Sequence, residues 1–236
     1  MDANELYDPE FRKLIKEKNP TIIIPVGSLE QHGAHLPITT DSDIVTEIAS
    51  RLAKKCNFVV LPTISYGISE EHHPLFHISL KENILLRILK RIHESLFQQG
   101  DIKMIILNGH HGNVGALKSA ERDETKFLRD FPQRKLRFYS YWHFMKHEFD
   151  HAGFVETSLM LAISDKVKMK KAKKGLITKD LSEKERKRIN KLSTEPGGFP
   201  KVAKNGVWGD PTNATKKDGE KFLAEIVRNL AKECQS

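Results

Sequence analysis

Four short apolar segments separated by helical patterns constrain the fold of this chain most strongly. Most of them run without alternating polar residues, which is typical of strands that are buried on both faces of a sheet. Between them, apolar residues recur at helical spacing, as in Ile44, Ile48 and Leu52. Such alternation of strands and helices predicts an α/β fold, in which a mostly parallel sheet carries helices on both faces. The predicted strands are Thr21–Val26, Phe58–Leu61, Met104–Leu107 and Leu136–Trp142.

Local signals indicate where the helices begin and end. Asp8 can cap a helix whose first residue is Pro9, and Pro20 ends it. Ser79 and Glu82 have the spacing of a capping box, which predicts a helix ending at Gly100. Further helices are predicted over about Val114–Asp130, from Thr157 through Ile163, and over about Ala214–Lys232, with an ordered loop from Ser193 to Asn213.

Size and composition are those of one globular domain that spans residues 1–236. The two cysteines are far apart in the sequence, so a disulfide framework is not expected and a reducing, cytoplasmic setting is favoured. The N-terminus has no basic segment followed by an apolar one, which argues against a signal peptide. No apolar run approaches the roughly 20 residues that span a bilayer, so no membrane partner is expected.

The formal charge of +8 is concentrated in one lysine-rich tract, residues 166–191. Such a surplus suits nucleic acid, anionic lipid or a phosphorylated substrate. The tract contains no aromatic residue that could stack on bases. It is therefore interpreted as a solvated, partly helical insertion, and no nucleic-acid partner is expected.

Polar side chains crowd the loop that follows the first predicted strand. One residue separates Glu30 from His32, so an extended backbone directs both side chains to the same side. Asp41 stands at the start of the next predicted helix, where a carboxylate can cap the helix and also bind a metal. Carboxylates together with imidazoles suit zinc, manganese or iron(II). With His35 nearby, the loop predicts a metal site that includes Glu30, His32 and Asp41.

Two further polar loops follow later strands. His110 and His111 lie between two glycines directly after the third strand, and His110 is a candidate source of another imidazole. His151 and Glu156 follow the fourth strand and are candidates for general acid/base catalysis. Glu156 is alternatively a metal ligand. Because ligands bind outside the carboxyl ends of parallel strands, the three loops are expected to converge.

Four segments together resemble the creatininase (creatinine amidohydrolase) family. The resemblance implies a three-layer α/β/α sandwich, a dinuclear metal centre and hydrolysis of C–N amide bonds other than peptide bonds. Family members commonly assemble as hexamers, which predicts a homo-oligomer. The segments are Gly27–Asp41, Asn108–Asn113, His151–Ser158 and Gly206–Pro211.

The resemblance also implies a role for each matching residue. Glu30 and His32 resemble ligands of different ions, and Asp41 resembles the carboxylate that bridges them. His110 resembles a ligand of the ion held by Glu30. The remaining pair, His151 and Glu156, matches the catalytic histidine of the family and its glutamate partner. Two divalent ions, Fe²⁺, Zn²⁺ or Mn²⁺, are the implied cofactors.

Two departures from the family pattern affect the expected substrate. His111 and Gly112 stand where creatininases have a tyrosine and then a glutamate ligand, so one carboxylate is missing and creatinine is a doubtful substrate. Glu156 is the candidate replacement ligand. Residues 73–80 differ from the Pro-Gly-Thr stretch of many members, which predicts a remodelled pocket that offers His72, His73 and His77 to the substrate.

The glycine-bearing loop after His110 resembles an archaeal deformylase branch of the family. The leading interpretation is therefore a metal-dependent amidohydrolase that removes formate from a formamidopyrimidine ribosyl phosphate in riboflavin and deazaflavin biosynthesis. Alternatives within the family are a creatinine amidohydrolase and a mycofactocin-type precursor peptidase. Alternatives of another class are a basic nucleic-acid-binding protein and a non-enzymatic oligomer with a vestigial metal site.

Overall fold

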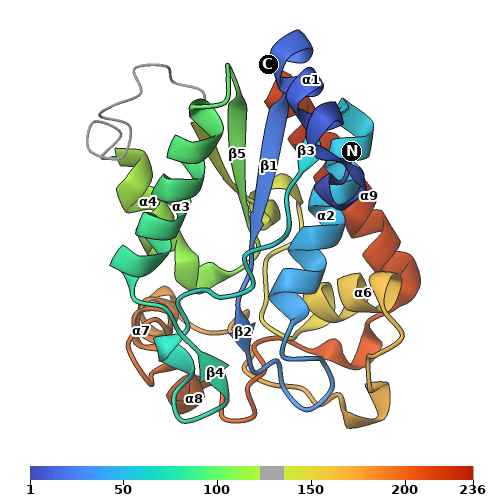
Figure 1. The fold of residues 1–236 in the computed structure, drawn as a ribbon. Coiled ribbons are helices and arrows are strands. Elements are labelled where there is room, and N and C mark those ends of the chain that lie inside the picture. The colour runs from blue at the N-terminus through green and yellow to red at the C-terminus, as the bar shows by residue number, and fades with distance from the viewer. Residues whose placement is uncertain (123–135, 236) are drawn as a thin grey trace.

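A computed structural model describes residues 1–122 and 136–235 of the chain. Its central sheet contains parallel strands in the order β3-β1-β5-β6 (Figure 1). The predicted α/β fold with a mostly parallel sheet is therefore confirmed. The strands are β1 (Thr21–Val26), β3 (Val59–Val60), β5 (Lys103–Asn108) and β6 (Leu136–Ser140).

Helices cover both faces of this sheet and form two separate apolar cores. Alternate residues of β1 enter different cores, because successive side chains of a strand point to opposite faces. Ile23 packs in the first core, whereas Ile22 and Ile24 pack in the second. The first core contains α2 (Thr40–Cys56), α6 (Phe154–Ile163) and α9 (Lys216–Gln235), and the second contains α1 (Asp8–Lys18), α3 (Glu82–Phe97) and α4 (Val114–Arg122).

The capping box predicted for α3 is absent, and that prediction was wrong. The helix begins at Glu82, and Lys81 precedes it without a side-chain cap. The Ser79 hydroxyl instead accepts a hydrogen bond from the Ser69 amide at 2.9 Å. The Ser79 hydroxyl therefore binds a backbone amide of another segment instead of capping the helix.

Other element boundaries differ from the predictions by a few residues. α1 includes Asp8 as its first residue, so this aspartate does not precede the helix. β6 ends at Ser140, and Tyr141–Phe144 form a short 3₁₀ helix instead of extending the strand. α9 begins and ends slightly later than predicted. The part of the predicted fourth helix beyond α4 lies outside the described residues.

A small antiparallel pair, β2 (Leu29–Glu30) with β4 (His77–Ile78), was not predicted. Strands of two residues are too short to give a periodic signal. The pair matters because it carries Glu30, which lies opposite His77. The Glu30 amide also donates to the Ile38 carbonyl at 3.0 Å, so the backbone of this residue is held from both sides.

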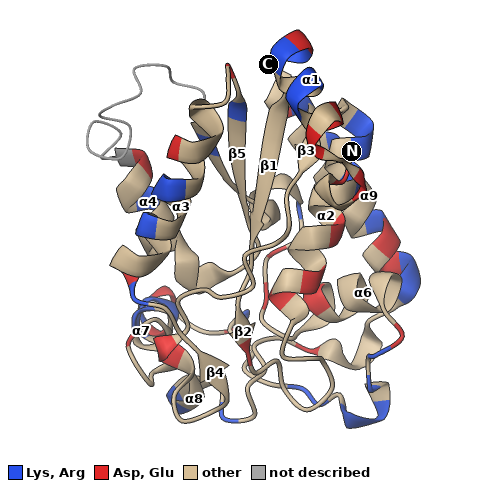
Figure 2. Ribbon diagram, viewed as in Figure 1, with Lys and Arg blue, Asp and Glu red and all other residues tan. Residues whose placement is uncertain are grey.

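The lysine-rich tract has only partial helical structure. It contains a 3₁₀ turn, Met169–Lys171, and most of α7 (Glu183–Ser193), whose N-terminus is capped by Ser182. α7 packs on the short helix α8 (Phe199–Val202). Figure 2 shows Lys and Arg on helices on both sides of the sheet. The absence of a nucleic-acid partner stays a prediction.

Two observations bear on the cellular setting. Both cysteines, Cys56 and Cys234, are free thiols. Within the described ranges, no helix combines the length and apolar character that a bilayer crossing requires. The cytoplasmic location stays a prediction.

Candidate metal centre

The loops that follow the parallel strands meet at one edge of the sheet, as this arrangement requires. They surround a cavity of about 700 Å³. Each of the main strands contributes polar side chains through the segment that follows it. The lining includes Glu30 after β1, Glu71 and His72 after β3, His110 after β5, and His151 and Glu156 after β6.

Asp41 lies in the first turn of α2 and between two imidazoles. Its Oδ1 is 3.1 Å from His32 Nε2, and its Oδ2 is 2.9 Å from His110 Nδ1. The Ser28 hydroxyl donates to the same Oδ2 at 2.6 Å. Both oxygens of a buried carboxylate therefore face imidazole nitrogens from different loops.

A glycine permits this close approach of the loop after β5 to α2. A Cβ atom at Gly109 would lie 2.6 Å from the Cβ of Val45 and 2.7 Å from the Asp41 carbonyl oxygen. Real Cβ atoms do not approach other atoms so closely, so a larger residue would push the loop away from the helix. Gly109 thereby keeps His110 beside Asp41.

Two groups of candidate metal ligands share Asp41. The first consists of Glu30, Asp41 and His110, and the second consists of His32, Asp41 and Glu156. In each group, one donor atom per residue lies within 4.8 Å of the others. A carboxylate common to both groups is what a bridged pair of ions requires.

Unpartnered oxygens in the site suit a bound cation. Both Glu30 oxygens and Oε1 of Glu156 are buried, and none accepts a hydrogen bond within the described structure. His72 Nε2 lies 3.0 Å and His110 Nε2 3.3 Å from the Glu30 oxygens without hydrogen-bond geometry. Burying such carboxylates is costly unless a cation compensates them. Oxygen and imidazole donors fit zinc, manganese or iron(II).

The carboxylates of the first group are held ionised by their neighbours. Burial disfavours ionised Glu30, but the charges of His110 and His72 outweigh it and lower the pKa of this carboxyl to about 2. Burial opposes ionised Asp41 in the same way. The charge of His32 and the hydrogen bond of His110 outweigh that burial and hold the Asp41 pKa well below its usual value.

The imidazoles respond in the opposite direction. Burial disfavours charged His32, yet the charge and hydrogen bond of Asp41 raise its pKa to about 10. Burial of His110 is likewise outweighed, chiefly by Glu30, and its pKa lies well above the usual value. Burial raises the pKa of Glu156 well above its ordinary value, although His32 opposes that rise. Protons therefore balance the carboxylate charge in the metal-free chain.

We expect divalent-metal affinity to rise with pH, because metal ligation requires neutral imidazoles. In the metal-free protein His32 stays protonated up to its raised pKa of about 10, and His110 is also protonated at neutral pH. Each displaced proton should change the affinity for Mn²⁺ about tenfold per pH unit between about pH 6 and 8. Calorimetric titration in buffers of different ionisation enthalpy would count the released protons. A flat affinity without proton release would contradict this expectation.

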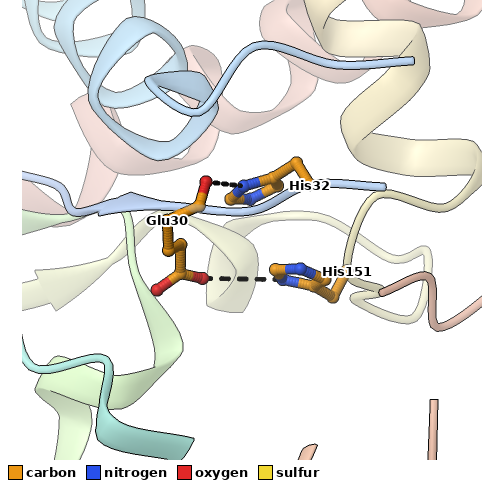
Figure 3. Close-up of side chains that lie close together, drawn as sticks. All are labelled: Glu30, His32 and His151. Atoms are coloured by element: carbon orange, nitrogen blue, oxygen red, sulfur yellow. Dashed lines mark hydrogen bonds and ion pairs between the residues drawn. The ribbon is translucent and has the colours of Figure 1, made fainter. Parts of the chain in front are cut away.

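His151 lies against the same cluster. Its ring centroid is 4.3 Å from that of His32, and its Nδ1 is 3.8 Å from Glu30 Oε1 (Figure 3). Its Nε2 lies 3.1 Å from both the backbone oxygen and the side-chain nitrogen of Gln31. Burial, and then the charges of His32 and His72, hold the His151 pKa well below its usual value. This imidazole is therefore neutral at neutral pH and can accept a proton.

Two residues of the site, Gln31 and Glu71, were not singled out by the sequence. The Gln31 side-chain nitrogen lies 3.0 Å from His72 Nδ1 and also contacts His151. Glu71 and His72 line the cavity beside Glu30. Both Glu71 and His72 follow β3, but the sequence does not show that the segment after β3 continues along β1. The bridge of Val26 with Ile64 provides that path and brings Glu71 to the cavity.

The structure does not bring every predicted histidine into the cavity. The buried His35 lies 3.0 Å from the Thr157 hydroxyl and is not in a ligand group of the described residues. His72 lines the cavity as expected, but His73 and His77 are not among its described lining residues. Instead, those two rings contact each other edge to face. His111 lines the cavity wall.

Comparison with known proteins gives a consistent family relationship. A family model described as Creatininase, creatinine amidohydrolase, matches residues 4–234. The chain is 33% identical over 222 residues to a mycofactocin precursor peptide peptidase of Mycobacterium ulcerans, covering 88% of this chain and 82% of that protein. It is 28% identical over 237 residues to a 2-amino-5-formylamino-6-ribosylaminopyrimidin-4(3H)-one 5'-monophosphate deformylase of Methanocaldococcus infernus, covering 94% of each. The peptidase thus shares more identical residues than the deformylase branch that the sequence favoured.

Solved creatininase structures share the fold. A manganese form has a TM-score of 0.83 at 23% identity, covering 98% of this chain and 96% of that one. A Zn-Zn form of a creatininase mutant has the same TM-score at 22% identity and the same coverage. At these identities the likeness concerns the fold, in which helices flank a mostly parallel sheet.

Proposed function

Because this chain belongs to the creatininase family, whose members are metal-dependent amidohydrolases, we propose that it hydrolyses an amide C–N bond in a small substrate at a centre of two divalent ions. The observation that carries this proposal is the pair of ligand groups sharing Asp41 in the cavity. Glu30, Asp41 and His110 would hold one ion, and His32, Asp41 and Glu156 the other. Zinc, manganese and iron(II) suit these donors.

The chemistry follows from the charges in the cavity. Ions bound there would supply Lewis acidity to the amide carbonyl and lower the pKa of a water molecule. His151 would move the proton that the water molecule gives up. A neutral imidazole can accept this proton at a ring nitrogen and return it to the departing nitrogen of the amide. Gln31 contacts His151 Nε2 and restricts the orientation of its ring. Glu156 would be a ligand of the second ion, and its Oε2 lies 3.6 Å from His32 Nε2.

The first candidate substrate is the formamide of a formamidopyrimidine ribosyl phosphate. The glycine-bearing loop after His110 and the similarity to the deformylase over 94% of both chains support it. Hydrolysis would break the formyl C–N bond, add water across it and release formate and an amine. The substrate would then be a phosphorylated small molecule.

The charge of the cavity favours a second candidate, an amide without phosphate such as a peptide. None of the described residues that line it is Lys or Arg, the side chains that usually bind phosphate. Beyond the proposed ligands, its acidic lining includes Glu70, Glu71 and Glu148. The peptidase relative at 33% identity also supports this candidate.

One parallel assay tests the proposal and separates the candidates. Metal-reconstituted protein would be incubated with a formamidopyrimidine nucleotide, a peptide that resembles a mycofactocin precursor, and creatinine. Formate release, mass spectrometry of the peptide and creatine formation are the respective readouts. We expect hydrolysis of one amide, and its loss after chelation. Fully metallated protein that hydrolyses none of these amides would contradict the proposal.

Glu156→Gln should weaken one of the two ions and lower turnover. Glu156 replaces, in this proposal, the carboxylate missing at position 112, and three carboxylates are the fewest that offset most of the charge of two divalent ions. The neutral amide keeps the shape of the side chain but removes one charge. Metal content by elemental analysis, measured beside turnover, distinguishes the roles: full occupancy with reduced rate would assign Glu156 to His151 alone, and normal values of both would exclude either role.

Two partner predictions accompany this function. The family resemblance supports a homo-oligomer, with a hexamer as the expected assembly. The lack of stacking aromatics in residues 166–191 supports the absence of a nucleic-acid partner. Light scattering and salt-dependent binding of labelled DNA or RNA would test these two expectations.

A further inference from the structure

Gly112 has no room for a side chain, and one of the groups that fills the space is a carboxylate. A Cβ atom at this position would overlap the Ile68 carbonyl oxygen and would lie 2.5 Å from His110 Nε2. It would also lie 2.7 Å from Oε1 of Glu71. A glutamate from another loop, Glu71, thus approaches the position at which creatininases carry a glutamate ligand.

Glu71 reaches this space from the segment that follows β3. Its side chain is only 14% exposed, and Oε1 lies 3.8 Å from His110 Nε2. One donor atom each from Glu71, Glu30 and His72 lie within 4.8 Å of one another. Glu71 therefore contacts the ligand set from the side of Glu30 and His110.

The adjacent acidic residue has a different environment. Glu70 forms an ion pair with Lys81, so its charge already has a partner. The Gly197 amide donates to the Glu70 carbonyl at 2.9 Å and helps to fix the backbone of this segment. Two neighbouring glutamates thus share the cavity wall, but only Glu71 lies among the metal-ligand groups of the described residues.

We propose that Glu71 is a metal ligand on the Glu30 side of the centre and that Gly112 is required to admit it. Metal–ligand bonds of about 2.0–2.2 Å allow two ligand atoms of one ion to lie up to about 4.4 Å apart, so the 3.8 Å separation of Glu71 and His110 suits a shared ion. Glu71 would then be a further carboxylate of the centre, beside Glu30, Asp41 and Glu156. This inference rests on the proposed metal centre.

Glu71→Gln and Glu70→Gln form a matched pair for the test. Cobalt(II) would be titrated into each metal-free variant, with visible absorption and calorimetry as readouts in the absence of substrate. Glu71→Gln should weaken one ion at least about tenfold and leave the other at its wild-type affinity. Glu70→Gln should leave both affinities unchanged. Wild-type affinity for every ion in a folded Glu71→Gln variant would overturn the proposal.

Gly112→Ala and Gly115→Ala provide the second arm. An added Cβ at Gly115 meets nothing within 4 Å, so this variant should bind cobalt as the wild type does. Gly112→Ala should weaken the same ion as Glu71→Gln, because the new methyl group meets both Glu71 Oε1 and His110 Nε2. If Gly112→Ala does not fold by circular dichroism, the Glu71→Gln result decides alone.

The two arms also separate this inference from the proposed function. Metal binding without hydrolysis of any amide would count against the function only. If the wild type binds a single ion, the dinuclear centre is wrong, and the effect of Glu71→Gln on that ion still decides the role of Glu71.

Discussion

Asp41→Ala is expected to remove both metal ions and to abolish amide hydrolysis. Asp41 is the residue common to both ligand groups, and its two oxygens lie 3.1 Å from His32 Nε2 and 2.9 Å from His110 Nδ1. Loss of a bridging carboxylate removes an anionic ligand from each ion at once. Metal polarisation of a carbonyl is worth several kcal/mol, and 1.36 kcal/mol is a tenfold change in rate, so turnover should fall by about three orders of magnitude or more.

Asp43→Ala is the matched control for this substitution. Asp43 also lies in the first turn of α2, but its carboxylate accepts a hydrogen bond from the Thr39 hydroxyl at 2.8 Å and belongs to no ligand group of the described residues. Elemental analysis, turnover and thermal unfolding would be measured for both variants. One ion retained at wild-type affinity in folded Asp41→Ala would show that Asp41 does not bridge.

Glu30→Ala should lose only one ion in the same measurements, whereas Asp41→Ala should lose both. Glu30 is not in the group of His32, Asp41 and Glu156, so that ion should remain bound. The contrast between one ion lost and two ions lost therefore tests the bridging arrangement, rather than only the presence of metal.

The fold was predictable because its strands are buried on both faces. β1 and β5 consist largely of apolar residues, and their lengths were predicted to within one residue at each end. Position in a parallel sheet then predicted that Glu30, His110 and Glu156 would line one cavity, which the structure shows. The chemistry lies at strand ends, so a correct sheet brings most of it together.

Features set by tertiary contacts were not predictable in this way. Ser79 has the sequence of a helix cap, yet its hydroxyl bonds the Ser69 amide from another segment. The β2–β4 pair is too short for a periodic signal, although it fixes Glu30. Glu71 lies eleven residues beyond β3, and only the path of the backbone along β1 brings it to the candidate metal ligands.

His151→Ala should lower turnover by about 10²–10⁴-fold while both ions remain bound, because the proposed task of His151 is proton transfer. Its low pKa keeps the imidazole neutral at neutral pH, so it begins as a proton acceptor. It gains a proton only as the pH falls below that lowered pKa. Wild-type turnover should therefore persist at moderately acidic pH wherever metal is saturating, and it should fall only below the lowered pKa of His151. The variant should lack that fall, because it has no imidazole to protonate.

Metal content decides between this role and ligation. His151 also forms a candidate ligand group with Glu30 and His32, and its Nδ1 lies 3.8 Å from Glu30 Oε1. If His151→Ala loses one ion, His151 is a ligand and the proton must move through another group. If turnover and metal content both stay near the wild-type values, His151 has neither role. Retained metal with slow turnover is the result expected here, because His151 lies outside both ligand groups that share Asp41.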